Sequence, residues 1–339
     1  NFVNKAKTEE KSAASFLRVV YQYMTAKNPA PQPEKQLPFI TLNADTFNEA
    51  PTDGYRVTWL GHSTTLIELD GLKIMTDPVF SDRASPFTWM GPKRFQKSPI
   101  DIADVPELDA VILSHDHYDH LDKESIEILD ARIKAYFTPL GVGEHLVSWG
   151  VDQDKITELD WWEEATVSKD VKVAAVPAQH FSGRGILDGN STLWASWAIL
   201  GKNERLFFSG DTGFHDEFAE IGERYGPFDL ALIENGAYNK SWPDVHMMPE
   251  ETVRASKLLK AKQFMPIHWG TFNLALHPWY EPAQRSYEIS KQQGVDIVQP
   301  RLGEFVNSNQ AKPLAQWWND QLEQTEEQLP TIEAVLVTG

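Results

Sequence analysis

Short apolar runs separated by polar segments recur from residue 55 onward, and they predict the strands of the protein. Residues 56–59 and 64–69 are the first two. Asp70-Gly71 then stands between apolar stretches over 66–69 and 72–75, which is a strong signal for a two-residue hairpin. Later runs predict further strands over residues 110–113, 171–176, 205–208, 229–233 and 264–267.

In the segments between these runs, apolar residues have the spacing typical of helices. The clearest helix begins at Asp122, a candidate N-cap, and places Ile126, Leu129 and Ile133 on one buried face. Residues 250–261 predict another helix. Strands that alternate with helices after an opening hairpin predict a layered α/β fold with mixed sheets.

The two ends of the chain differ from this alternating region. Residues 13–23 have helical spacing, with Phe16, Val19, Val20 and Tyr23 on one face, and a Pro-rich linker follows. We expect this helix to dock on the body of the protein in preference to a membrane surface. The predicted organisation is an N-terminal extension over 1–50, a main domain over 51–307 and a tail over 308–339 with one helix around 316–328.

Length and composition restrict the chemistry. With 339 residues, the chain can bury a sizeable core without disulfides or a structural metal, so a bound metal would serve catalysis. Its 31 Lys and Arg residues against 49 Asp and Glu residues give a net charge of −18, which repels phosphate backbones and argues against nucleic acid as a partner. The absence of cysteine leaves only His and carboxylate side chains as metal ligands.

Residue 1 is Asn and not Met, which predicts a trimmed chain that a signal or anchor segment could have preceded. No run is long enough to cross a bilayer. The location therefore stays open between a bacterial cytoplasm and the cell envelope.

Each of four predicted strands leads into potential metal ligands. Because strand ends in α/β folds converge on one edge of a sheet, side chains that are far apart in the sequence can meet there. In chain order the candidates are His115, His117, Asp119, His120, His180, Asp211 and His268.

Five imidazoles and two carboxylates without thiolate suit zinc first, and iron or manganese next. His115 and His117 can grip one ion from a single short loop, while Asp119 and His120 can face a second. Seven ligands are too many for one tetrahedral site but suffice for two divalent ions that share a carboxylate. Asp211 is the natural candidate for that bridge.

With these residues the sequence resembles the metallo-β-lactamase superfamily over about residues 55–307. The resemblance implies a four-layer αββα sandwich of two mixed β-sheets with its site at one edge. It also implies the ligand sets: His115, His117 and His180 for one metal, Asp119, His120 and His268 for the other, and Asp211 between them.

The flanking residues narrow the branch. Lack of cysteine excludes the β-lactamases that use a Cys ligand, His117 stands where flavin-diiron proteins carry a glutamate, and the acidic charge argues against the nucleases. The sequence resembles the N-acyl-phosphatidylethanolamine-hydrolysing phospholipase D family over residues 59–64, 76–86, 91–95, 177–180, 210–213, 246–251 and 267–272. Residues 239–241 depart from that family's pattern, which leaves the substrate open.

The predicted activity is hydrolysis by a hydroxide held between two metals. The resemblance favours a phosphodiesterase of phospholipase D type, acting on N-acyl-phosphatidylethanolamine or a similar lipid or organic phosphodiester. A lactonase or another carbon-centred hydrolase is the alternative, because the same ions would polarise a carbonyl. A non-catalytic protein is disfavoured because all seven ligands are present.

Three residues receive catalytic roles. We expect Asp119 and Asp211 to orient the hydroxide, and His246 to contact the substrate or protonate the leaving group. His62 is expected to support a ligand from outside the coordination sphere.

The predicted partner is a small molecule or a lipid. Lys93, Arg94 and Lys97 form a basic cluster beside Phe87 and Trp89. Such a cluster could make peripheral contact with a membrane. The preferred interpretation is a solvated loop with aromatic residues packed beneath it. The sequence does not define an oligomeric state.

Overall fold

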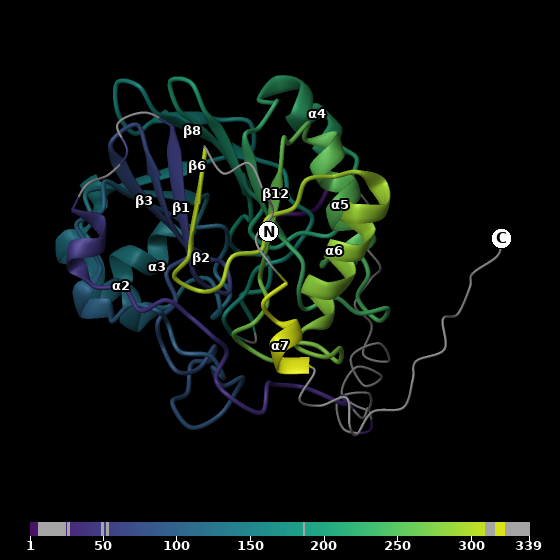
Figure 1. Cartoon of the computed structure of the whole chain (residues 1–339). Helices are drawn as coiled ribbons and strands as arrows, with labels where there is room; N and C mark the ends of the chain where they lie inside the picture. The colour runs from purple at the N-terminus through teal and green to yellow at the C-terminus, as the bar shows by residue number, and fades with distance from the viewer. Residues whose placement is uncertain are drawn as a thin grey trace.

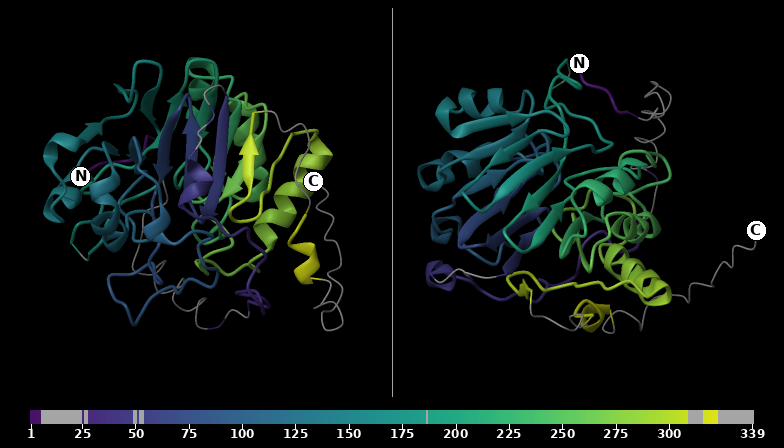
Figure 2. Two further views of the ribbon diagram at one scale, coloured as in Figure 1. Left: turned by 60° about the vertical axis from the view of Figure 1, so that its left-hand side comes forward. Right: turned by 90° about the horizontal axis from the view of Figure 1, so that it is seen from above.

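The computed structural model describes residues 1–5, 25, 28–48, 51, 54–185, 187–308 and 316–322. Two mixed β-sheets face each other, and helices cover their outer faces (Figures 1 and 2). This arrangement confirms the predicted four-layer αββα sandwich.

One sheet has seven strands. The order across the sheet is β13 (Phe305–Asn307), β1 (Tyr55–Gly61), β2 (Thr64–Leu69), β3 (Leu72–Thr76), β4 (Ala110–Ile112), β5 (Tyr136–Pro139) and β6 (Ile156–Leu159). Neighbouring strands from β13 to β3 are antiparallel, and neighbouring strands from β3 to β6 are parallel.

The other sheet has six strands, of which β12, β11 and β10 are parallel and the remaining neighbours are antiparallel. The order is β12 (Phe264–Ile267), β11 (Leu230–Glu234), β10 (Arg205–Phe208), β9 (Ser196–Leu200), β8 (Lys172–Val176) and β7 (Glu164–Thr166). Strands β8, β10, β11 and β12 therefore all point the same way.

The hairpin between β2 and β3 forms where the sequence predicts it. Asp70 and Gly71 have φ of 50° and 81°, the left-handed pair that a tight turn between twisted strands requires. Leu66 pairs with Met75 and Ile67 with Ile74, so alternate residues on both strands face opposite sides of the sheet.

Three apolar layers follow from this alternation. Ile67 and Ile74 face the space between the sheets, where they join Trp197 and Phe208 of the other sheet. The outer face of the seven-stranded sheet packs against α2 (Lys123–Leu129) and α3 (Gly143–Ser148). The outer face of the six-stranded sheet packs against α4 (Glu217–Arg224), α5 (Pro249–Leu258) and α6 (Glu281–Gln293).

Both flanking regions contribute to these layers. Leu37 and Trp318 are buried in the core between the sheets, and Phe47 packs on the outer face of the seven-stranded sheet. The predicted helix over 13–23 lies outside the described residues. Of the predicted helix over 316–328, the described residues contain α7 (Asn319–Leu322). Within the described part of the chain, no helix combines the length and the apolar character needed to cross a membrane.

The helix predicted from Asp122 is shorter than expected. It ends at Leu129, and Ile133 is buried only after a further 3-10 turn. The Asp122 carboxylate does not cap the helix; it accepts hydrogen bonds from the amides of Phe80 and Ser81 and fastens the preceding loop. Strands β5 to β7, β9 and β13 and helices α3, α4 and α6 were not predicted.

Ile67→Ala tests the layer between the sheets. Deleting this fully buried side chain should lower the free energy of unfolding by about 2–5 kcal/mol, because the packed neighbours cannot fill the cavity. Ile128→Ala, at an exposed position of α2, is the matched control and should stay within about 0.5 kcal/mol of the wild type. Denaturant titration measures both, and equal losses would contradict the layer assignment.

Candidate metal centre

The ends of four strands bring the predicted ligands to one edge of the sandwich. The segment from His115 to His120 follows β4, His180 follows β8, Asp211 follows β10 and His268 follows β12 directly. All seven predicted ligands meet there in two neighbouring groups.

The first group consists of three histidines and one carboxylate. His117 Nδ1 lies 2.8 Å from His115 Nε2 and 3.2 Å from His180 Nε2. Asp211 Oδ2 lies 3.9 Å from His115 Nε2 and 3.7 Å from His180 Nε2. Four potential ligand atoms therefore surround one point.

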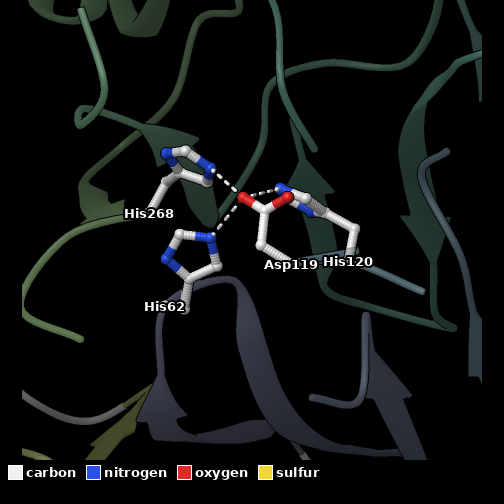
Figure 3. A group of neighbouring side chains, drawn as sticks. All are labelled: His62, Asp119, His120 and His268. Carbon is white, nitrogen blue, oxygen red and sulfur yellow. Dashed lines mark hydrogen bonds and ion pairs between the residues drawn. The ribbon is translucent and has the colours of Figure 1, made fainter. Parts of the chain in front are cut away.

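The second group shares Asp211 with the first. Its other oxygen, Oδ1, lies 3.1 Å from the Nε2 atoms of both His120 and His268. Asp119 Oδ2 lies 3.4 Å and 3.3 Å from the same two nitrogens (Figure 3). Asp211 thus presents one oxygen to each group, which is the position that a bridging ligand requires.

His62 completes the second group from the turn between β1 and β2. Its Nε2 lies 3.0 Å from Asp119 Oδ2 (Figure 3), while its buried Nδ1 has no hydrogen-bond partner among the described residues. Because a buried N–H without an acceptor is costly, the proton belongs on Nε2 and is donated to Asp119. Burial lowers the pKa of His62 to about 3, so the ring is neutral. This geometry agrees with the expected supporting role.

The donor atoms fit divalent ions. Tetrahedral coordination at about 2 Å places neighbouring ligand nitrogens roughly 3.3 Å apart, close to the separations seen in the first group. His120 Nε2 and Asp211 Oδ1 are buried and lie 3.1 Å apart, but neither makes a hydrogen bond of good geometry in the described part of the chain. An ion between them would satisfy both atoms.

Asp77, which sequence reasoning missed, holds two of these histidines. Its Oδ2 lies 2.6 Å from His120 Nδ1 and accepts a 2.6 Å hydrogen bond from the Ser114 hydroxyl, which in turn lies 2.9 Å from His115 Nδ1. A carboxylate behind a ligand histidine fixes its tautomer and orientation. Asp77 lies directly after β3, within the segment that resembles the phospholipase family, so its strand-end position was the available signal.

Glu234 plays a similar part for His246 and was also missed. This fully buried residue ends β11, and its Oε2 lies 3.3 Å from His246 Nδ1. The Met247 amide donates to its Oε1. His246 Nε2 lies 3.9 Å from Asp211 Oδ2, so the structure brings this predicted catalytic residue to the edge of the centre.

Three residues at this edge have a strained backbone. His62, Asp77 and His268 have φ of 54°, 33° and 65°, in a region that side-chain-bearing residues seldom occupy and that is retained mainly at functional sites. Gly210 has φ of 55°, and a Cβ there would lie 2.3 Å from the Cβ of Ser114. Glycine therefore permits the close approach of the two sheets beside Asp211.

Burial and mutual charge set the protonation of the centre. Burial disfavours imidazolium, so the pKa values of His115 and His180 lie well below the usual range and that of His117 falls to about 4. Burial opposes charge at His120 and His268 too, but Asp211 and Asp119 outweigh it. The pKa of His120 lies well above its ordinary value, and that of His268 rises to about 9.

The two carboxylates remain ionised. Burial alone would raise their pKa values, but nearby histidines, His120 above all, hold the pKa values of Asp119 and Asp211 well below the usual range. Three neutral imidazoles and two carboxylates are the protonation states in which these groups bind a cation.

The basic loop between β3 and β4 differs from the preferred interpretation. Arg94 is tied to the carbonyls of Val79 and Ser81, and its guanidinium lies over the Phe272 ring. Trp89, by contrast, is 72% exposed, so the loop does not simply cover packed aromatic residues. Membrane contact through this loop stays a prediction.

Comparison with known proteins agrees with the fold and with the predicted class of protein. The family model described as a beta-lactamase superfamily domain matches residues 73–269. An uncharacterised protein of Mycobacterium tuberculosis is 45% identical over 306 residues, which cover 89% of this chain and 81% of that protein. The Caenorhabditis elegans protein named N-acyl-phosphatidylethanolamine-hydrolyzing phospholipase D 1 is 42% identical over 269 residues, covering 76% and 75% of the two chains.

Among solved structures, the metallo hydrolase Igni18 from the archaeon Ignicoccus hospitalis superposes with a TM-score of 0.58. It is 22% identical, and the match covers 75% of this chain and 98% of that one, which supports the fold alone. The chain belongs to the metallo-β-lactamase superfamily and is a metal-dependent hydrolase of that fold. Within the superfamily it resembles the N-acyl-phosphatidylethanolamine-hydrolysing phospholipases D.

Asp77→Asn tests the hydrogen bonds behind the ligands. The carboxylate accepts from His120 and the Ser114 hydroxyl at Oδ2 and from the Ser114 amide at Oδ1, and an Asn side chain would place a donor NH2 at one of these two positions. Affinity for divalent ions should therefore fall about 10- to 100-fold. Competition with a chromophoric chelator measures this affinity. Asp101→Asn, which alters an exposed residue at a distant 3-10 turn, should bind as the wild type does. An unchanged affinity in Asp77→Asn would contradict a role for Asp77 in orienting the ligands.

Proton release provides a second test. Because the pKa values of His120 and His268 are raised, both rings carry protons at pH 7 before an ion binds, and the ion must displace them. Apparent metal affinity should therefore rise as the pH increases from 7 toward about 9, the pKa of His268. Calorimetry at pH 7 in buffers of different ionisation enthalpy counts the released protons. Binding enthalpies that are independent of the buffer would contradict the assignment.

Proposed function

We propose that this protein is a phosphodiesterase of phospholipase D type, acting on N-acyl-phosphatidylethanolamine or a similar lipid or organic phosphodiester. The observation that carries the proposal is Asp211, which offers a separate oxygen to each of two buried ligand groups. The name of the 42% identical relative supports the substrate class.

In this proposal the centre holds two divalent ions, with zinc as the preferred metal because all donors are imidazole or carboxylate. Bound there, the ions would supply a hydroxide nucleophile near neutral pH and offset negative charge that develops on the substrate oxygens. His115, His117 and His180 would hold one ion. Asp119, His120 and His268 would hold the other, and Asp211 would contribute an oxygen to each.

The protein's own residues orient the reacting groups. Asp211 and Asp119 are ionised acceptors, so each can fix the direction of a hydroxyl proton on the nucleophile. His62 holds Asp119 in place through its Nε2–H. These contacts are made before substrate arrives, so the centre needs little reorganisation during the reaction.

His246 is the residue that we propose for contact with the substrate. Its side chain is 12% exposed, whereas the side chains of His120 and His268 are fully buried, so His246 is the more accessible of these imidazoles. Glu234 anchors Nδ1 and leaves Nε2 directed toward the centre, 3.9 Å from Asp211. A proton on Nε2 can be donated to the departing oxygen of the substrate.

A lactonase or another carbon-centred hydrolase is the second candidate. The ions would polarise a carbonyl oxygen as they would a phosphoryl oxygen. Residues 239–241, in the loop between Glu234 and His246, depart from the phospholipase pattern, which leaves the substrate open between the two candidates. In this loop the Trp242 indole donates to the Ala237 carbonyl.

A substrate panel separates the two candidates. Zinc-loaded protein should hydrolyse bis(p-nitrophenyl) phosphate and N-acyl-phosphatidylethanolamine in preference to acyl-homoserine lactones. Turnover of lactones alone would make the phospholipase proposal wrong and leave the metal centre intact.

Asp211→Asn tests the centre itself. Replacing one anionic oxygen with an amide nitrogen removes a ligand from one of the two groups, so hydrolysis should fall to background and fewer than two ions should be retained. Metal analysis after dialysis and the panel assay measure both quantities. Asp101→Asn is the control and should keep full activity. Full activity in Asp211→Asn would refute the bridging assignment.

A further inference from the structure

Residues 1–5 lie against the loop that carries His180, although about 175 residues separate them in the sequence. The purple segment runs beside the teal part of the chain in both views of Figure 2. The Phe2 amide donates to the Asn190 carbonyl at 2.9 Å, and Lys5 Nζ lies 4.0 Å from Glu217 Oε1. These contacts fix the segment on both sides of Asn4.

Asn4 grips the backbone of His180 from both sides. Its Nδ2 donates to the His180 carbonyl at 2.8 Å, and its Oδ1 accepts from the His180 amide at 3.1 Å. The same Oδ1 accepts from the Trp194 indole at 3.0 Å. One side-chain amide therefore satisfies both polar backbone groups of a single residue, as a neighbouring strand would do.

His180 needs such a partner because it lies beyond the end of β8 and is 1% exposed. A buried N–H or C=O without a partner is costly, so without Asn4 this stretch of backbone would move to find other partners. Such a shift would carry the imidazole with it.

One hydrogen bond anchors the far side of the His180 ring. Its Nδ1 lies 2.9 Å from the Val245 carbonyl, which directs Nε2 toward His117 and Asp211. This hydrogen bond defines the tautomer of the ring. The backbone hydrogen bonds of Asn4 fix the Cα from which the ring projects.

We propose that Asn4 is a positioning residue for His180, and that the segment 1–5 is thereby part of the metal centre. The inference rests on the proposed metal centre. It assigns to Asn4 no contact with substrate or with an ion. The bidentate pattern requires one donor and one acceptor on the same side chain, which only an amide of this length supplies.

Two substitutions at Asn4 separate its chemistry from its bulk. Asn4→Ala removes both hydrogen bonds, whereas Asn4→Asp keeps the size and the acceptor but replaces the donor with an oxygen that repels the His180 carbonyl. Both should weaken zinc binding by about tenfold or more, measured by chelator competition on the full-length protein. Asn43→Ala, which removes an exposed cap of the 3-10 turn Ala44–Phe47, is the matched control and should bind zinc as the wild type does.

A double-mutant cycle distinguishes positioning from general stability. In a His180→Ala background, Asn4→Ala should cause no further loss of zinc affinity, because the ring it positions is gone. The unfolding midpoint of the zinc-free variants shows whether each one folds. Additive losses in the cycle, or wild-type affinity in Asn4→Ala and Asn4→Asp, would overturn the proposal. If the wild-type protein binds no divalent ion, the metal centre itself is wrong, and this inference falls with it.

Discussion

The buried carboxylate of Asp211 is the interaction on which the rest of the structure depends. A charged group this deep in a protein is stable only when opposite charge or many hydrogen bonds surround it. Here imidazoles from three strand ends surround it. Removing the carboxylate would leave His115 and His180 without the oxygen that they share, and His120 and His268 with Asp119 alone.

The cluster forms because the two sheets face each other with their ligand-bearing strand ends at one edge. Strand β4 delivers its ligands from one sheet, while β8, β10 and β12 deliver theirs from the other. The layers must approach closely at their edge, and Gly210 is where they do so, against Ser114. The left-handed backbone at His62, Asp77 and His268 turns side chains inward that an ordinary strand end would direct elsewhere.

The sequence was informative where chemistry and local pattern coincide. Five of the seven predicted ligands are histidines at the ends of apolar runs, so the sequence singled out side chains that the fold brings together. Asp70-Gly71 was predictable because its conformation marks the hairpin. Asp77 and Glu234 look like ordinary acidic residues, and only the folded chain shows which histidine each one touches. Asn4 is harder still, because its partner lies about 175 residues away and an Asn carries no signal of its own. Helix α6 could not be predicted because it buries Pro282, Ala283, Ser286 and Ser290, small or polar side chains that form no apolar stripe in the sequence.

The spacing of the ligands along the chain has a consequence for folding. They extend from His115 to His268, and their supports reach back to Asn4, so almost the whole fold must assemble before the donors meet. An unfolded chain offers an ion no comparable set, and the free energy of binding is therefore added to the free energy of folding. Metal supply would then govern how much of the protein persists in its native form, in addition to how fast it works. The bound ions would stabilise the fold after the strands have assembled, and these ions come from outside the chain.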